Sequence, residues 1–249
     1  MKRAAAFALL CVLTAPVARA GLEQPVDNVG HPIAGIIPHR EYRVQVRLTP
    51  ESSLQGGVRL GFKDRVQVGV FYGVQKLVET GSPTANDHLG FEVRARVLEE
   101  ARWPAVAVGF DSQGWYAYDG AYQRYERKSP GVYAVASKNW HSFAGDLSLH
   151  LGANYSLETA DGDDAPDMFG AADWTIANAV SLLGDLDMAW NDDTPDGRFG
   201  EGGVYVDVGV RVALGAHLQL MLVFSDLTRN LGPDAEIGRE LEVTYLNWF

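Results

Sequence analysis

Residues 204–214 read Val-Tyr-Val-Asp-Val-Gly-Val-Arg-Val-Ala-Leu, with Val or Leu at every second position. The residues between them are Tyr205, Asp207, Gly209, Arg211 and Ala213. Because the side chains of a β-strand alternate between its two faces, this stretch predicts a strand with one apolar and one largely polar face.

The same period of two recurs along the chain, so the pattern predicts twelve strands, an even number. Each is close to the ~9–11 residues with which a strand crosses an outer membrane. The fold class that this favours is all-β: a closed antiparallel up-and-down transmembrane β-barrel of about 12 strands. The other predicted strands are Tyr42–Leu48, Val58–Lys63, Val66–Gln75, Phe91–Val97, Pro104–Phe110, Val132–Asn139, Leu147–Gly152, Phe169–Ala177, Val180–Met188, His217–Phe224 and Arg239–Phe249.

The connections between these strands alternate in length, as they do in bacterial barrels with short periplasmic turns and longer outer loops. Thr49–Ser53 is a short outer connection and the one exception. The short turns are Lys63-Asp64, Glu99–Arg102, Trp140–Gly145, the turn around Asn178, and Gly215-Ala216. The long loops are Leu77–Asp87, Asp111–Pro130, Glu158–Asp167, Asn191–Glu201 and Asp226–Gly238.

The chain ends on Phe249, with Tyr245, Val243 and Leu241 on the same face of the last predicted strand. This resembles the C-terminal signal that barrel-insertion machinery reads, with Tyr245 and Phe249 as the assembly signal; Asn247 departs from it. We expect Leu241–Phe249 to pair with Tyr42–Leu48 and close the barrel. Aromatic residues at or near strand ends are expected at the membrane interface: Tyr42, Tyr72, Trp103, Tyr133, Tyr155, Trp174, Trp190 and Trp248.

The N-terminus predicts export. Lys2 and Arg3 precede an apolar run, and Ala18-Arg19-Ala20 fits a cleavage site, so residues 1–20 are expected to be a cleaved Sec-type signal peptide and 21–249 the barrel domain. Cys11, the only cysteine, lies inside that peptide. Without Lys2, Arg3 and Arg19 the chain has 18 basic and 32 acidic residues, a net charge of −14, which disfavours nucleic acid.

Alternation alone fits two kinds of barrel. In a membrane barrel the Val/Leu face meets lipid and the charged face lines the lumen; in a soluble lipocalin-like periplasmic binder the faces are exchanged. The strand number, signal peptide and terminal Phe favour the bacterial outer membrane, with its lipids as partners.

On the membrane assignment, the lumen has two walls of opposite charge. This arrangement predicts either a narrow channel with a transverse field or charges that pair across a filled interior. The basic wall is Arg43, Arg47, Arg59, Lys63, Arg94 and Arg96, and the acidic wall is Asp146, Asp173, Asp185, Asp187 and Asp207.

No motif of enzyme chemistry stands out. The six histidines show no metal-ligand spacing, and His150 faces the predicted lumen, so no catalytic residue, metal or cofactor is assigned. Asp161-Gly162-Asp163-Asp164 and Asp192-Asp193 could supply calcium ligands, but fit solvated acidic loops better.

Residues 91–114 (FEVRARVLEEARWPAVAVGFDSQG) and 131–140 (GVYAVASKNW) resemble the YjbH family of outer-membrane barrels. The shared features are a strand, an acidic turn, a P-x-V-A-V-G strand, a D-x-x-G loop and a Y-x-V-A-S-K strand; Asp146–Gly152 also fits. The resemblance implies a non-enzymatic role linked to exopolysaccharide. The loop after Asp111 carries Trp115, Tyr116, Tyr118, Tyr122 and Tyr125, which could stack on sugar rings or pack over the barrel mouth.

These features support two further hypotheses besides the soluble binder. One is an envelope accessory or narrow channel whose basic wall attracts anionic polysaccharide. The other is a structural or adhesive barrel with a filled lumen that acts through its outer loops.

Overall fold

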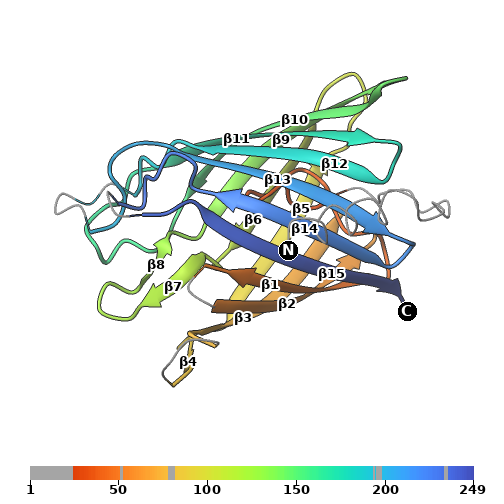
Figure 1. The fold of residues 1–249 in the computed structure, drawn as a ribbon. Coiled ribbons are helices and arrows are strands. Elements are labelled where there is room, and N and C mark those ends of the chain that lie inside the picture. Colours follow the sequence, from red (N-terminus) through yellow and green to blue (C-terminus); the bar gives the residue numbers. More distant parts are fainter. Residues whose placement is uncertain (1–24, 51–52, 78–81, 193, 195–197, 233–234) are drawn as a thin grey trace, which may run out of the picture.

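The computed structural model describes residues 25–50, 53–77, 82–192, 194, 198–232 and 235–249. Twelve antiparallel strands form a closed ring, in which each strand pairs with its neighbour in sequence, as predicted (Figure 1). The ring consists of β1 (Glu41–Thr49), β2 (Ser53–Phe62), β3 (Val66–Gln75), β5 (Gly90–Leu98), β6 (Ala105–Asp111), β9 (Gly131–Ser142), β10 (Gly145–Tyr155), β11 (Asp167–Ile176), β12 (Val180–Asp187), β13 (Tyr205–Leu214), β14 (Leu218–Ser225) and β15 (Gly238–Trp248).

The first and last strands close the ring, and the predicted pairing is confirmed. Tyr42 lies opposite Asn247, and Leu48 lies opposite Leu241. The strand itself ends one residue early, at Trp248, but the Phe249 amide still donates to the Arg40 carbonyl at 3.1 Å. Closure leaves no unpaired sheet edge, which hydrocarbon would not tolerate.

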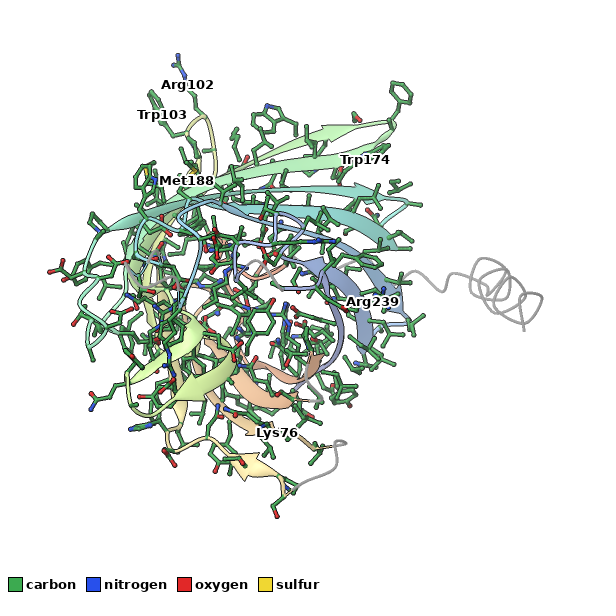
Figure 2. All side chains as sticks on the ribbon, turned by 60° about the vertical axis from the view of Figure 1, so that its left-hand side comes forward. Lys76, Arg102, Trp103, Trp174, Met188 and Arg239 are labelled. Carbon is green, nitrogen blue, oxygen red and sulfur yellow. The ribbon has the colours of Figure 1, made fainter. Side chains whose placement is uncertain are left out.

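The two faces of the ring differ sharply in polarity. Val44, Val70, Leu149, Leu182 and Val210 are exposed on the outside, whereas the charged residues between them on the strands are mostly buried inside. Figure 2 shows Trp174 on the outside of the sheet and Trp103 on the protruding turn between β5 and β6. An apolar exterior around a polar interior is the arrangement of a membrane barrel, so the soluble lipocalin-like alternative is wrong.

One aromatic residue departs from the expected interfacial belt. Tyr133 is only 2% exposed and points into the barrel, where its hydroxyl accepts a hydrogen bond from Arg94 Nε at 2.7 Å. Residues 132–135 alternate in burial as a barrel strand requires, and Tyr133 falls on the inner face.

The barrel has a turn end and a loop end. Residues 63–65, 143–144 and 215–217 are short turns at the turn end, where β1 also begins and β15 ends. The loop end carries β4 (Thr84–Ala85) and a separate hairpin of β7 (Trp115–Asp119) and β8 (Arg124–Arg127), which were not predicted as strands (Figure 1). The predicted signal peptide, residues 1–20, lies outside the described residues. In the described part of the chain, no helix is long and apolar enough to cross a membrane.

Candidate functional site: a plugged and lidded lumen

The segment before the first strand, which the alternation left unassigned, lies inside the barrel. We call residues 25–38 the plug. Asp27 bridges to Pro32, the Asn28 amide donates to the His31 carbonyl at 3.0 Å, and the Ile33 amide donates to Val26 at 3.3 Å. The plug is therefore a hairpin-like loop. Its buried apolar side chains are Val26, Val29, Ile33, Ala34, Ile36 and Ile37.

Two glycines allow the plug to pass where it is most crowded. A Cβ at Gly35 would lie 2.0 Å from the carbonyl oxygen of Pro25, on the other arm of the loop. A Cβ at Gly61 on β2 would lie 2.2 Å from the carbonyl oxygens of Ile37 and Pro38. Any side chain at either position would force the plug backbone to move.

On one side, arginines hold the plug. Arg94 donates through Nη1 to three plug carbonyls: Val26, Ile33 at 3.1 Å and Gly35 at 3.3 Å. Its Nη2 pairs with Asp27 at 2.6 Å, and Arg59 Nη2 holds the other Asp27 oxygen at 2.7 Å. The Asp27 carboxylate thus sits between two guanidinium groups.

On the opposite side, aspartates hold the plug. Asp185 accepts the backbone amides of Gly30 and His31, at 2.7 and 3.0 Å, and the Asn28 side-chain amide at 2.5 Å. The His31 ring lies 3.2 Å from Asp187 and stacks on Phe169 with centroids 4.7 Å apart. The plug therefore presents a carboxylate to the basic wall and an imidazole to the acidic wall.

The predicted basic residues fall into two groups. Arg43, Arg47, Arg59 and Arg94 are buried in the lumen, whereas Lys63 is exposed at a turn and Arg96 is partly exposed near the turn end. The same wall also carries acidic residues that were not predicted. Arg43 pairs with Glu41 at 2.5 Å, Arg47 with Glu240 at 2.6 Å and Arg59 with Glu92 at 2.6 Å.

The predicted acidic residues divide similarly. Asp173, Asp185, Asp187 and Asp207 are buried, while Asp146 pairs with His141 at the turn end, 2.9 Å away. Arg211, on the same side, donates to the plug carbonyls of Asp27 and Asn28 at 2.8 and 2.7 Å. Among the described residues, these wall charges therefore pair within their own wall, with the plug or with the loops.

His150 faces the lumen, as expected. Its Nδ1 lies 2.7 Å from Ser137 Oγ and its Nε2 lies 3.0 Å from Asp173. Ser137 Oγ also accepts the amide of Ala34 at 2.9 Å. The buried Asp-His-Ser chain therefore ends on the plug, which covers the hydroxyl and is anchored by it.

The Tyr-rich loop folds over the lumen. We call residues 115–127 the lid, and the five predicted contact residues all belong to it. The Trp115 ring lies against Gly30 and, with centroids 5.9 Å apart, against His31 of the plug. Tyr118 packs edge-on against Tyr125 at 5.1 Å. Tyr122 packs on Phe199 at 5.4 Å, and the Tyr116 hydroxyl lies 3.4 Å from Glu240.

Charged groups fix the lid to the barrel and to its neighbouring loops. Arg127 reaches Asp207 at 2.7 Å and Asp187 at 2.9 Å. Arg124 is fully buried between Asp161, at 2.5 Å, and Asp192. Asp161 also pairs with Lys128 at 2.9 Å. This carboxylate of the predicted acidic loop therefore forms ion pairs with basic side chains of the protein itself.

The carboxylates around Arg124 give lid docking a pH dependence. Burial raises the pKa of Asp192 to about 6 despite Arg124 and Tyr205, so the docked lid favours its protonated form. Burial also acts to raise the pKa of Asp161, but hydrogen bonds from Lys128 and Arg124 outweigh it, and that pKa is lowered. Through Asp192, the stability of lid docking is lost as pH rises through about 6. Through Asp161, it is lost at acid pH, as pH falls from the ordinary pKa of an aspartate through the lowered pKa of Asp161.

We expect hydrogen-exchange protection of residues 115–127, corrected for intrinsic exchange, to fall about tenfold from pH 5 to pH 7. Asp192→Asn removes the titrating group and should keep the protection at pH 7 close to its value at pH 5. If protection in Asp192→Asn fell by the same factor between pH 5 and pH 7, another titrating group would be responsible.

A cavity of about 60 Å³ remains between the plug and the wall formed by β1–β3 and β13–β15. Plug residues 25–30 form one side of it. The other side carries Arg43, Arg47, Arg59 and Arg211, the acidic residues Asp111 and Glu242, and Gln45, Gln55, Gln219, Thr244 and the ring of Phe71. The space suits a few water molecules or one small polar group.

The assembly signal lies where the C-terminal pattern predicts. Tyr245 is exposed on the outer face of β15, and Phe249, 59% exposed, follows it at the turn end. Recognition by insertion machinery stays a prediction.

Sequence reasoning missed the plug because an irregular segment has no period to detect. A signal was present nonetheless. Five Ile or Val residues lie between 26 and 37 and need a buried environment. The three prolines and two glycines from 25 to 38 prevent this segment from forming a spanning strand. Asp27, His31, Glu92 and Arg127 were missed with it.

No model of a known protein family matches the sequence, and no curated protein matches it. Among solved structures the fold is similar to the KdgM porin, with a TM-score of 0.51 and 11% identity over 82% of this chain and 98% of that one. The KdgM porin in complex with disordered oligogalacturonate matches with a TM-score of 0.50, 11% identity and the same coverage. Omp33 of Acinetobacter baumannii matches with a TM-score of 0.45 and 10% identity, over 84% of this chain and 97% of that one. With its apolar exterior and closed ring, the protein is a bacterial outer-membrane β-barrel; the YjbH resemblance stays a prediction.

Proposed function

We propose that the protein is an outer-membrane channel held closed by its own plug, and that it admits anionic saccharides. The observation that carries this proposal is how the plug is held. Among the described residues, most hydrogen bonds between plug and barrel strands use wall side chains, such as those of Arg94, Ser137 and Asp185. In addition, the Asn28 side-chain amide donates to the strand carbonyls of Ala172, at 3.2 Å, and Gly184, at 2.7 Å. All twelve strand pairings are made without the plug, so it can leave while the barrel stays closed.

The choice of an anionic solute is supported by the arginines that line the cavity beside the plug. Guanidinium groups bind carboxylates with two parallel hydrogen bonds and keep their charge at all physiological pH values. The KdgM porin, a barrel of similar fold, is described in complex with oligogalacturonate, an acidic oligosaccharide. The YjbH resemblance likewise points to polysaccharide, through exopolysaccharide production. The proposal assigns no catalytic residue.

A second candidate is an adhesive barrel that acts through its loops with a permanently filled lumen. It is favoured by a cavity of about 500 Å³ on the lid, lined by Tyr118, Asp119, Glu126, Arg198 and Phe199. Aromatic rings beside charged groups can bind a sugar from outside. Removing Trp115–Tyr125 would then abolish surface binding while the barrel still folds.

A reversible cross-link distinguishes the two. The Ala34 amide lies 2.9 Å from Ser137 Oγ, so cysteines at these positions are within reach of a disulfide. Because Cys11 lies in the predicted signal peptide, the mature chain adds no competing thiol. In planar bilayers, Ala34→Cys/Ser137→Cys should be silent when oxidised and should conduct anions preferentially after reduction.

The singly substituted Ala34→Cys serves as the control, and it should respond to neither oxidant nor reductant. A doubly substituted protein that stays silent after reduction, and whose barrel is folded by heat-modifiable migration, would support the adhesive barrel. Conduction that persists in the oxidised form would show that the plug does not close the pore.

A further inference from the structure

We propose that Arg59 and Arg94 form a binding site for the carboxylate of a hexuronate, and that the plug's Asp27 occupies this site in the closed barrel. The inference rests on the proposed function and goes further, because it names the group that is recognised and the residues that recognise it. It also makes the solute a competitor of the plug.

Glu92 orients the two arginines. It lies on β5, where one of its oxygens accepts a hydrogen bond from Arg59 Nε at 2.6 Å and the other forms an ion pair with Arg94 Nη2 at 3.1 Å. Gln67 donates to Glu92 as well, and the Glu92 side chain is almost completely buried. Arg59 is further fixed over the Phe71 ring, with 4.7 Å between its guanidinium carbon and the ring centroid. The guanidinium pair is thus held by the wall, whether or not the plug is present.

The charge balance marks this pair as unlike its neighbours. Arg43 pairs with Glu41 and Arg47 with Glu240, both carboxylates of the wall, and Glu242 lies opposite Arg47 on the neighbouring strand. Arg59 and Arg94 share Glu92, and their second carboxylate is Asp27 of the plug. Asp111 lines the same cavity but, among the described residues, forms no ion pair with either arginine; its carboxylate accepts the Gln113 amide at 2.8 Å.

When the plug leaves, the guanidinium groups of Arg59 and Arg94 face the lumen, and Glu92 is the one carboxylate that stays in direct contact with them. A second carboxylate restores the balance and regains the hydrogen bonds that Asp27 made. Beside the pair, Gln45, Gln55 and Thr244 offer partners for hydroxyl groups, and Phe71 offers an apolar face for a sugar ring. A carboxylate joined to a polyhydroxylated ring fits this set, which is the chemistry of a hexuronate.

The test uses the full-length protein with D-galacturonate and D-galactose, which differ at C6. Plug displacement is followed by the fluorescence of Trp115, which lies against Gly30, taken as the difference from Trp115→Phe. Galacturonate should change this signal saturably, and galactose should not. In Asp27→Asn, half-saturation should occur at about a tenfold lower concentration or less, since the competing carboxylate is gone.

Arg59→Gln should abolish the response to galacturonate. Arg65→Gln removes the same charge at an exposed turn, where Arg65 pairs with Glu99, and should respond like the wild type. Asp27→Asn keeps both arginines, so it decides the matter even if Arg59→Gln does not fold. An unchanged half-saturation in Asp27→Asn, or equal responses to the two sugars, would overturn the site.

The two proposals fail separately. A galacturonate response without conductance in any variant supports the site and overturns the channel. Conductance after reduction of the cross-linked protein, with no response to galacturonate, overturns the site and leaves the channel standing.

Discussion

Removing residues 26–37 is expected to turn a closed barrel into a steady pore, with a single-channel conductance at least about tenfold above that of the wild type. The plug fills the centre of the lumen. Its removal also leaves Asp185, Asp187, Arg59 and Arg94 facing water, where isolated charges are tolerated. Planar-bilayer recordings of refolded protein measure the change.

The deletion needs a control for length. Replacing residues 26–37 with twelve Gly and Ser residues keeps the connection but removes the contacts of Asp27, His31 and Ala34. It should conduct nearly as well as the deletion. If both variants fold, as judged by heat-modifiable migration, and neither conducts, the wall and lid close the lumen alone, and the adhesive candidate gains support.

The strands could be predicted because hydrocarbon imposes a strict rule on them. Each must present apolar side chains outward at every second position, and each must find a partner for its backbone. Val204–Leu214 shows this period without interruption, and β13 extends over Tyr205–Leu214. The predicted start of the second strand, Val58, came five residues late, because Gly56, Gly57 and two polar residues interrupt the pattern in β2.

The lumen could be predicted only in part. Strand parity correctly places Arg43 and Asp185 inside the barrel. The alternation alone does not show which charges pair. Arg47 lies opposite Glu242 but pairs with Glu240, one position further along the same face, and Asp27 comes from a segment without a strand. The two walls were expected to oppose each other across a channel or to pair directly; instead, the plug lies between them and bonds to both.

The lid illustrates the same limit at a loop. Five aromatic residues within eleven positions predict a surface that packs on something, and a sugar or the barrel itself satisfies that composition equally. The deciding contacts are made by Trp115 with Gly30 and by Arg127 with Asp207, residues far apart in the sequence. No local pattern encodes them.

Replacing Arg94 with Met is expected to weaken plug docking by about 3–5 kcal/mol, the usual effect of removing one partner from a buried ion pair. Arg94 is 1% exposed, and its loss leaves Asp27 and Glu92 with Arg59 as their one remaining arginine partner and removes the donor of the Ile33 and Gly35 carbonyls. Because the plug can leave and water can enter, the cost should appear in docking rather than in the barrel. Hydrogen-exchange protection of residues 28–37 should fall by about 100-fold or more, while the amides of β10–β13 keep theirs.

Arg65→Met is the matched control, because it removes an arginine from an exposed pair, 58% and 59% accessible, that contributes at most about 1 kcal/mol. A second variant separates charge from packing. In Arg94→Met/Asp27→Asn the plug carboxylate that lost one of its two arginine partners is gone as well. The loss of protection should therefore be smaller than the sum of the two single effects, since the two groups are in contact. Unchanged protection of residues 28–37 in Arg94→Met would show that the remaining contacts of Arg59, Asp185 and Ser137 hold the plug, and that Arg94 does not control its release.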